Sequence, residues 1–107
     1  MEIKQYDIVL VDLADSRGAE MALTRPCAVL SPDEMNRYLR TLVVSPMTTR
    51  ARTYPSRVRV RHNRQTGWIA VDQITTIDRK KVIRNLGRLS HPEIRKVKAV
   101  IRETYVD

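Results

Sequence analysis

Two short stretches of the sequence place a guanidinium and a hydroxyl beside the ends of apolar runs. In TRPCAVLS, Arg25 stands just before the run that begins at Pro26, and in VVSPMTTR, Thr48 follows a similar run. If these runs are neighbouring antiparallel strands, both side chains reach the same edge of a sheet. A guanidinium matches phosphate oxygens, and a hydroxyl can donate one more hydrogen bond. Such a pair can hold a phosphate and stabilise charge that grows on a phosphoryl group under attack.

The same residues also have an ordinary structural explanation. Arginine before proline is common, and threonine after proline usually belongs to a turn. From the spacing alone, the structural explanation is the favoured one. Arginine stays protonated near neutral pH and is a poor general base. We therefore assign Arg25, as a hypothesis, to charge stabilisation in the transition state or at the leaving oxygen.

The charge of the chain favours a polyanionic partner. The 107 residues include 20 Lys and Arg against 12 Asp and Glu, for a formal charge of +8. This excess favours nucleic acid ahead of an anionic membrane, although a merely basic protein would also show it. No apolar run approaches the ~20 residues of a membrane span. The start, MEIKQYD, leads into no signal-like segment, so we expect one cytoplasmic domain over residues 1–107.

Cysteine and histidine are too few to suggest a metal centre. The one cysteine, Cys27, lies in an apolar run and is interpreted as a packing residue. His62 and His91 have no ligand-type neighbour in the sequence. We expect no metal site and no cofactor.

Short apolar runs predict a mainly β fold with helices (α+β), as a curled sheet or small barrel. Six such runs are YDIVLVDL, CAVLS, LVVSP, SRVRVRH, GWIAVDQ and KKVIRNLGRL. In SRVRVRH, Val58 and Val60 alternate with Arg57, Arg59 and Arg61. The arginines form either a solvated outer face on an edge strand, which is slightly favoured, or a basic rail for phosphates. The sequence leaves the direction of this face open.

Two S-x-x-E signatures predict helices. The first, from Ser31 to Glu34 with Pro32 as the first helical residue, opens a short helix through about Leu39. The second, at residues 90–93, opens a C-terminal helix that we expect to pack on the sheet through a stripe of Ile94, Val97, Ile101 and Tyr105. Residues 15–24 are expected to form a loop between the first two strands.

Four motifs occur in a specific order: R-G-A-E at 17–20, T-R-P at 24–26, S-P-M-T-T at 45–49 and V-D-Q-I-T-T-I-D at 71–78. In this order the chain resembles the MazF/PemK family of toxin endoribonucleases over nearly its whole length. The resemblance implies a small SH3-like β-barrel with a short helix and a C-terminal helix, working as a homodimer. It also implies the toxin component of a type II toxin–antitoxin system, inhibited by an acidic antitoxin that occupies the RNA groove.

The activity implied by the resemblance is metal-independent, sequence-specific cleavage of single-stranded RNA such as mRNA. The ribose 2′-OH attacks the adjacent phosphate and yields 2′,3′-cyclic phosphate and 5′-OH ends. Residue by residue, the family's catalytic arginine and threonine fall on Arg25 and Thr48. Its groove residues fall on Glu20, Asp72 and Gln73. Position and charge add further candidates for RNA binding, namely Asn36, Thr49, Arg50, Arg52 and Tyr54.

Some of these candidates have a competing structural explanation. Asn36 is equally well explained as a residue at the end of a helix, and Gln73 as a side chain that braces the backbone. Tyr54 is preferred for base stacking, whereas Trp68 is assigned to the core or to a dimer contact.

The chain departs from the family at a few positions. Ala19 and Ala70 stand where some members have a histidine and an arginine, so a mechanism with that pair as acid and base is not available. Tyr6 stands where glycine is frequent. We attach no functional weight to this exchange.

Two other functions compete with the nuclease. A non-catalytic nucleic-acid-binding barrel fits the charge and the strands equally well. A topoisomerase-poisoning toxin of the same fold is disfavoured, because the chain ends in T-Y-V-D without the Trp-containing terminus expected there.

Overall fold

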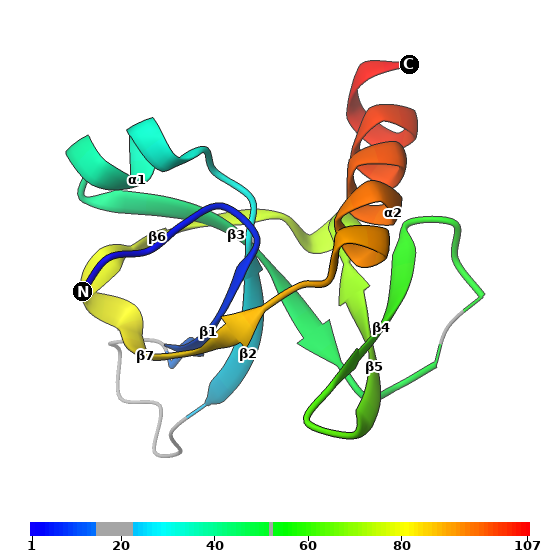
Figure 1. Ribbon diagram of the computed structural model, residues 1–107, viewed down its shortest axis with the longest axis horizontal. Helices are drawn as coiled ribbons and strands as arrows, with labels where there is room; N and C mark the ends of the chain where they lie inside the picture. The colour runs from blue at the N-terminus through cyan, green and yellow to red at the C-terminus, as the bar shows by residue number, and fades with distance from the viewer. Residues whose placement is uncertain (15–22, 52) are drawn as a thin grey trace.

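A long, curled antiparallel sheet forms the body of the protein (Figure 1). The computed structural model describes residues 1–14, 23–51 and 53–107. Within these residues the strands are β1 (Asp7–Asp12), β2 (Thr24–Val29), β3 (Thr41–Thr48), β4 (Arg57–His62), β5 (Gln65–Ala70), β6 (Thr75–Asp78) and β7 (Val82–Arg88). The helices are α1 (Asp33–Tyr38) and α2 (His91–Ile101), with short helical turns η1 (Val71–Gln73), η2 (Arg79–Lys81) and η3 (Arg102–Val106). No helix in the described ranges is long and apolar enough to cross a membrane.

Strand β3 is shared by the two ends of the sheet. The strand order is β4-β5-β3-β2-β1-β7, and β6 also pairs with β3. One edge of β3 pairs with β2, while its other edge pairs first with β6 and then with β5. All of these pairings are antiparallel. The fold class predicted from the sequence is therefore confirmed.

Turn η1 is an insertion between two strands that both run along β3. Thr48 is opposite Trp68 and Val44 is opposite Thr75, so the five residues 44–48 on β3 correspond to the eight residues 68–75 on the other side. The three extra residues form η1, where Asp72 and Gln73 are exposed. The predicted strand GWIAVDQ therefore ends at Ala70, and the D-Q pair lies in a turn.

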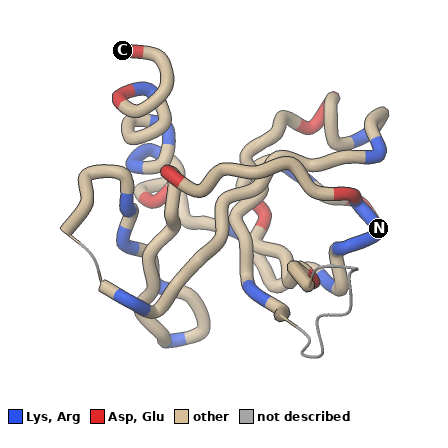
Figure 2. The backbone as a smooth tube through the Cα atoms, turned by 180° about the vertical axis from the view of Figure 1, so that it is seen from behind, with Lys and Arg blue, Asp and Glu red and all other residues tan. Residues whose placement is uncertain are grey.

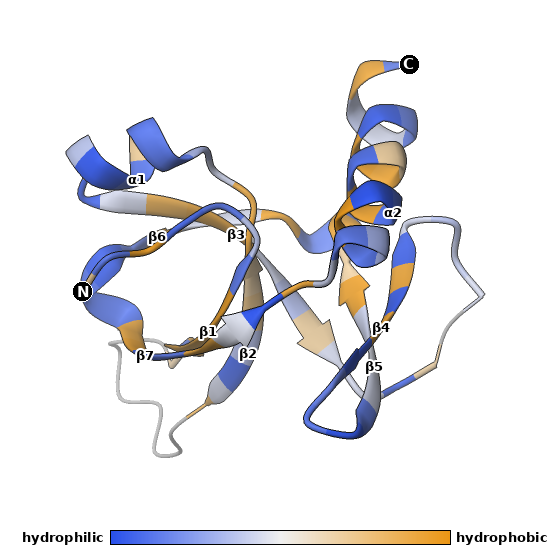
Figure 3. Ribbon diagram, in the orientation of Figure 1, coloured by the Kyte–Doolittle hydropathy of each residue, from blue (hydrophilic) through white to orange (hydrophobic). Residues whose placement is uncertain are grey.

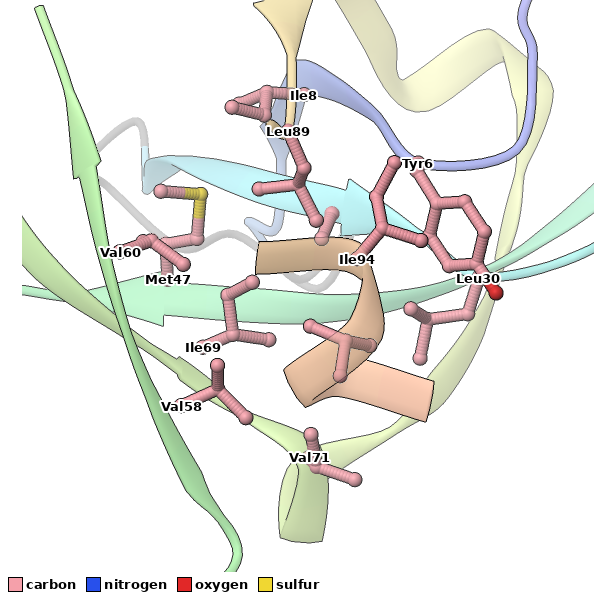
Figure 4. Close-up of a cluster of buried hydrophobic side chains, with 12 residues drawn as sticks. Tyr6, Ile8, Leu30, Met47, Val58, Val60, Ile69, Val71, Leu89 and Ile94 are labelled. Atoms are coloured by element: carbon pink, nitrogen blue, oxygen red, sulfur yellow. The ribbon is translucent and has the colours of Figure 1, made fainter. Parts of the chain in front are cut away.

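Apolar side chains pack against both faces of the sheet. On one face, α2 covers a cluster that includes Met47, Val58, Ile69 and Ile94 (Figure 4). The curl of the sheet encloses a second cluster built around Val9, Leu42 and Val44. Hydropathy follows this arrangement, since hydrophobic residues recur along the strands and on one side of α2 (Figure 3). The predicted packing of the C-terminal helix is confirmed for Ile94, Val97 and Ile101, whereas Tyr105 lies in η3 and is exposed.

The two helix starts differ in their capping. Ser90 caps α2 through a capping box with Glu93, as predicted. Glu93 also accepts a hydrogen bond from the backbone nitrogen of Arg61 at 2.8 Å, which ties the helix to the edge strand β4. Helix α1 is present where it was predicted, but its predicted capping was wrong, because the N-cap is Pro32 and no side chain caps the helix. Ser31 is buried and accepts instead from the backbone nitrogen of Val43 at 3.1 Å.

Candidate active site

Arg25 and Thr48 converge on one cavity of about 420 Å³. On neighbouring strands β2 and β3, Cys27 pairs with Pro46. The same antiparallel register, carried two residues further along each strand, sets Arg25 opposite Thr48. Both side chains therefore project from the same face of the sheet, because two steps along a strand return to the same face. The convergence predicted from the sequence is present in the structure.

The hydroxyl of Thr48 is oriented by the turn that follows β3. Its Oγ1 accepts a hydrogen bond from the backbone nitrogen of Arg50 at 3.1 Å. This is the turn chemistry expected for a threonine at the end of a strand. A hydroxyl that accepts one bond keeps its own proton for donation, so Thr48 can still donate to a ligand. The structural and the chemical explanations of this residue are therefore compatible.

Several predicted RNA-binding residues line the same cavity. Thr49 and Arg50 extend the rim beyond β3, and both are exposed. Gln73 reaches the cavity from η1, because the three inserted residues carry its side chain away from the ladder. With Arg25, these side chains supply positive charge together with hydroxyl and amide hydrogen-bonding groups. Such a set suits a phosphate and the polar edge of a base.

Arg57 also lines the cavity, although the sequence analysis did not include it among the site residues. Its Nε donates to Asp72 Oδ1 at 2.8 Å and its Nη2 to Oδ2 at 3.2 Å. The guanidinium carbon lies 5.3 Å from the ring centroid of Tyr54. The alternation in SRVRVRH was the available signal, but the strand pattern alone did not say which arginine would face a site.

The carboxylate of Asp72 is held in its ionised form. Hydrogen bonding from Arg57 lowers its pKa below the ordinary value, and a bond from the Ser56 hydroxyl adds to this effect although burial opposes it. A general base works best when its pKa is near the working pH. Asp72 therefore suits the positioning of a cation better than proton transfer.

The remaining arginines of β4 continue the basic face away from the cavity. Val58 and Val60 are buried in the core, as predicted, and Arg59 and Arg61 are exposed. The two arginines line a second hollow of about 260 Å³, to which α2 contributes Lys96. Lys and Arg positions recur along the hairpin of β4 and β5 when the molecule is seen from behind (Figure 2). The arginine face of β4 therefore reaches the cavity at Arg57 and is exposed at Arg59 and Arg61.

Other predicted site residues lie elsewhere. Asn36 is 1% exposed, and its amide donates to the backbone oxygen of Ser31 at 2.8 Å. Asn36 lies within α1 and not at its end, so its structural role is that of a buried, hydrogen-bonded side chain, and we do not retain it as an RNA-contacting residue. Glu20 and Arg52 lie outside the described residues. Trp68 is partly buried on β5 between Arg59 and Thr48 in the strand register. Cys27 is fully buried, as expected.

Comparison with known proteins agrees with this fold. The MazE-MazF structure (Form-II) from Deinococcus radiodurans aligns with a TM-score of 0.84 and 23% identity, over 96% of this chain and 95% of that chain. A mycobacterial endoribonuclease in complex with its cognate antitoxin gives a TM-score of 0.81 and 20% identity, over 94% and 92%. The Mycobacterium tuberculosis toxin MazF-mt6 gives 0.76 and 21%, over 91% and 93%.

The fold and the cavity define a small β-barrel protein with a basic pocket at the end of β3. The description "PemK-like, MazF-like toxin of type II toxin-antitoxin system" matches residues 4–105. The chain belongs to this family. The family resemblance inferred from the motifs is therefore confirmed.

Proposed function

We propose that this protein is a toxin that acts as a metal-independent endoribonuclease on single-stranded RNA. The observation that carries the proposal is the meeting of Arg25 and Thr48 in one basic cavity. The family assignment and the likeness to solved endoribonucleases support it. A merely structural arginine would have no reason to share a solvent-open hollow with a hydroxyl and further cations.

The proposed reaction needs no group beyond the RNA, the protein and solvent water. The ribose O2′ attacks the adjacent phosphorus, a new O2′–P bond forms, and the P–O5′ bond breaks. The O2′ proton passes to water and O5′ takes a proton from water, so the products are a 2′,3′-cyclic phosphate and a 5′-OH end. Arg25 offers a fork of N–H donors to the phosphate oxygens, and Thr48 donates one hydrogen bond. Their contribution is to stabilise charge that develops during attack.

The rim of the cavity is suited to binding the flanking nucleotides. Gln73 carries donors and an acceptor that can pair with a base edge, and Arg50 and Thr49 can contact phosphate. We further propose, from the family, a homodimer with RNA lying across it and an antitoxin with an acidic segment as inhibitor. Against a net charge of +8, antitoxin binding should be fast and should weaken as salt rises. Affinity independent of salt would contradict this electrostatic part of the proposal.

One assay tests the nuclease proposal against the non-catalytic alternative. The purified protein is incubated with a long single-stranded RNA in EDTA, and the fragments and their end groups are analysed. We expect discrete fragments with 5′-OH ends. Tight binding to RNA that stays intact would instead support a nucleic-acid-binding module.

Two variants guard the assay against a contaminating nuclease. Thr48→Ala removes the proposed hydroxyl and should abolish cleavage. Thr76→Ala removes an exposed threonine from β6, outside the lining of the cavity, and should cleave like the wild type. Equal cleavage by the Thr48→Ala variant would overturn the proposed site.

A further inference from the structure

We propose that Arg57 is a second phosphate-binding guanidinium of the cavity, and that Asp72 is the residue that positions it. This inference rests on the proposed function. It changes the role of Asp72, which the sequence analysis placed among the RNA-contacting residues, to that of a residue acting through Arg57.

The strand register explains how Arg57 reaches the cavity. Arg57 on β4 is the cross-strand partner of Ala70 on β5, and both line the hollow that holds Arg25 and Thr48. Directly paired residues in a sheet have their Cβ atoms ~5 Å apart and project from the same face. Because the side chain of Ala70 ends at Cβ, the space above it is left to the longer side chain of its partner.

Turn η1 brings the carboxylate to this place. The backbone nitrogen of Val71 donates to the backbone oxygen of Ser56 at 3.0 Å, and the hydroxyl of Tyr105 donates to the backbone oxygen of Val71 at 2.7 Å. Both polar groups of this backbone unit are therefore tied down, one to the start of β4 and one to the C-terminal turn. Asp72, the next residue, is held beside Arg57 by these two bonds.

Arg57 is held by two neighbouring side chains. Asp72 accepts two of its N–H groups, and the ring of Tyr54 lies 5.3 Å from its guanidinium carbon. The Ser56 hydroxyl donates to Asp72 Oδ1 at 2.8 Å and so fixes the carboxylate. A long side chain held in this way loses little conformational entropy when a ligand binds, which favours binding.

The pairing with Asp72 leaves the guanidinium of Arg57 with further N–H donors for a phosphate. The pairing with Asp72 uses Nε and one N–H of Nη2, and a guanidinium has five N–H donors in all. The donors that the pairing does not use are on the two terminal nitrogens. With Arg25, the cavity then offers two guanidinium groups beside Thr48. Two cations match the additional negative charge that a phosphodiester gains on attack better than one cation does.

A purely structural role for the ion pair makes different predictions. The side chains of Arg57 and Asp72 are 9% and 35% exposed, so the pair is largely shielded from water and loss of one partner should destabilise the fold. If the pair merely joined β4 to η1, its loss would change the free energy of unfolding and leave the turnover of the folded enzyme unchanged. If it positions a cation for the reaction, turnover changes in the folded protein.

The experiment measures kcat and KM for a short single-stranded RNA with one cleavage site, together with urea unfolding of each variant. Arg57→Gln should lower kcat roughly 100-fold, comparable with the loss of one transition-state donor in other enzymes. Asp72→Asn should lower kcat less, because the guanidinium is still present. The double variant should be no slower than Arg57→Gln alone, since Asp72 acts through Arg57. Arg37→Gln, an exposed arginine of α1 outside the cavity, is the matched control.

A relocated arginine tests the position of the charge. Combining Arg57→Ala with Ala70→Arg returns a guanidinium to the same cross-strand pair from the opposite strand. We expect this double variant to recover part of the kcat that Arg57→Ala loses. Arg57→Lys, which keeps the charge and the length with less change of packing, serves as the second test if a variant fails to fold.

The outcomes separate this inference from the proposed function. If Arg57→Gln and Arg57→Lys keep the wild-type kcat while Thr48→Ala abolishes cleavage, the inference is wrong and the nuclease proposal stands. If Asp72→Asn is slower than Arg57→Gln, Asp72 acts directly and the positioning role is wrong. If Thr48→Ala cleaves like the wild type, the proposed function itself fails.

Discussion

Arg25 on β2 and Thr48 on β3 line one cavity from adjacent antiparallel strands, and their side chains lie on the same face of the sheet. Both strands continue into the packed core, where Val29 and Val44 are fully buried. A pair of groups carried by such strands keeps its geometry better than a pair carried by loops. This placement supports the proposal that Arg25 and Thr48 form a preorganised site for a phosphate.

Replacing Arg25 with lysine tests whether the fork of N–H donors matters. Arg25→Lys keeps the positive charge but loses the planar, bidentate geometry. We expect kcat for RNA cleavage to fall by roughly 10²–10³, as for the loss of one transition-state donor. Arg37→Lys on the exposed surface of α1 is the control and should cleave normally. Near wild-type cleavage by the Arg25→Lys variant would argue against a bidentate role.

The stability of the protein should depend on pH through Asp72. Hydrogen bonding from Arg57 lowers the pKa of Asp72 in the folded state. A carboxyl group of this kind stabilises the fold above its unfolded pKa of about 3.9 and loses that contribution as the pH falls. The urea midpoint of the wild type should thus exceed that of Asp72→Asn at pH 6, and the difference should shrink below about pH 5.

Exposed Glu34 on α1 provides the control for this measurement. Glu34→Gln should have the same urea midpoint as the wild type at pH 6. A difference between wild type and Asp72→Asn that stayed constant from pH 6 to pH 3 would show that ionisation of Asp72 does not stabilise the fold.

The hydroxyl of Tyr105 should stabilise turn η1. Tyr105→Phe removes its hydrogen bond to the backbone oxygen of Val71, which is 2.7 Å long and partly buried. The free energy of unfolding should fall by about 1 kcal/mol, as for an ordinary hydrogen bond. Urea unfolding measures this change, and Tyr38→Phe on the exposed surface of α1 should leave the stability unchanged. Equal losses in the two variants would rule out the contribution of this bond.

Cys27 should be unreactive in the folded protein. Burial raises the pKa of its thiol to about 12, although the nearby charge of Arg25 acts in the opposite direction. The side chain is 0% exposed, and the thiolate is the reactive form. A thiol reagent at pH 8 should therefore label the protein in urea and leave the native protein unlabelled. Rapid labelling of the native protein would show that the strand carrying Arg25 opens readily.

At position 6, glycine should give a more stable protein than alanine, which is the reverse of their usual order of stability. The φ of Tyr6 is 70°, in the left-handed region that favours glycine, and the side chain is buried. Tyr6→Ala loses the ring and keeps the backbone strain, whereas Tyr6→Gly loses the ring and relieves the strain. We expect both variants to be destabilised by roughly 2–5 kcal/mol. Tyr6→Gly should be the more stable of the two by about 1 kcal/mol in urea unfolding. The opposite order would contradict this account.

The structure also explains why tyrosine at position 6 is an unusual residue for the family. The family resemblance implies that glycine is frequent at this position, and the exchange for tyrosine carries no functional weight. The structure supplies the physical reason, because the backbone at this point is left-handed. The tyrosine ring, packed among the residues of the main core, offsets the strain that a side chain meets there.

Local patterns in the sequence were sufficient for much of the fold. The alternation of valine and arginine in β4 and the capping box at Ser90 depend on residues close together in the chain, and both are present. The short strand β6 was missed because its four residues, TTID, carry little apolar pattern. The S-x-x-E signature at Ser31 predicted the wrong cap for α1, since the Ser31 hydroxyl accepts a hydrogen bond from Val43 on β3 instead of capping the helix.

The sequence by itself determined the mainly β class, the helix at the C-terminus and the family, and it predicted Arg25 and Thr48 as the reacting residues of the site. Tertiary structure decided which charges work together. The register of β4 with β5 pairs Arg57 with Ala70, and the insertion at η1 brings Asp72 into an ion pair with Arg57. These relations depend on pairing between distant segments, which local propensity does not specify, so only the folded chain could reveal them.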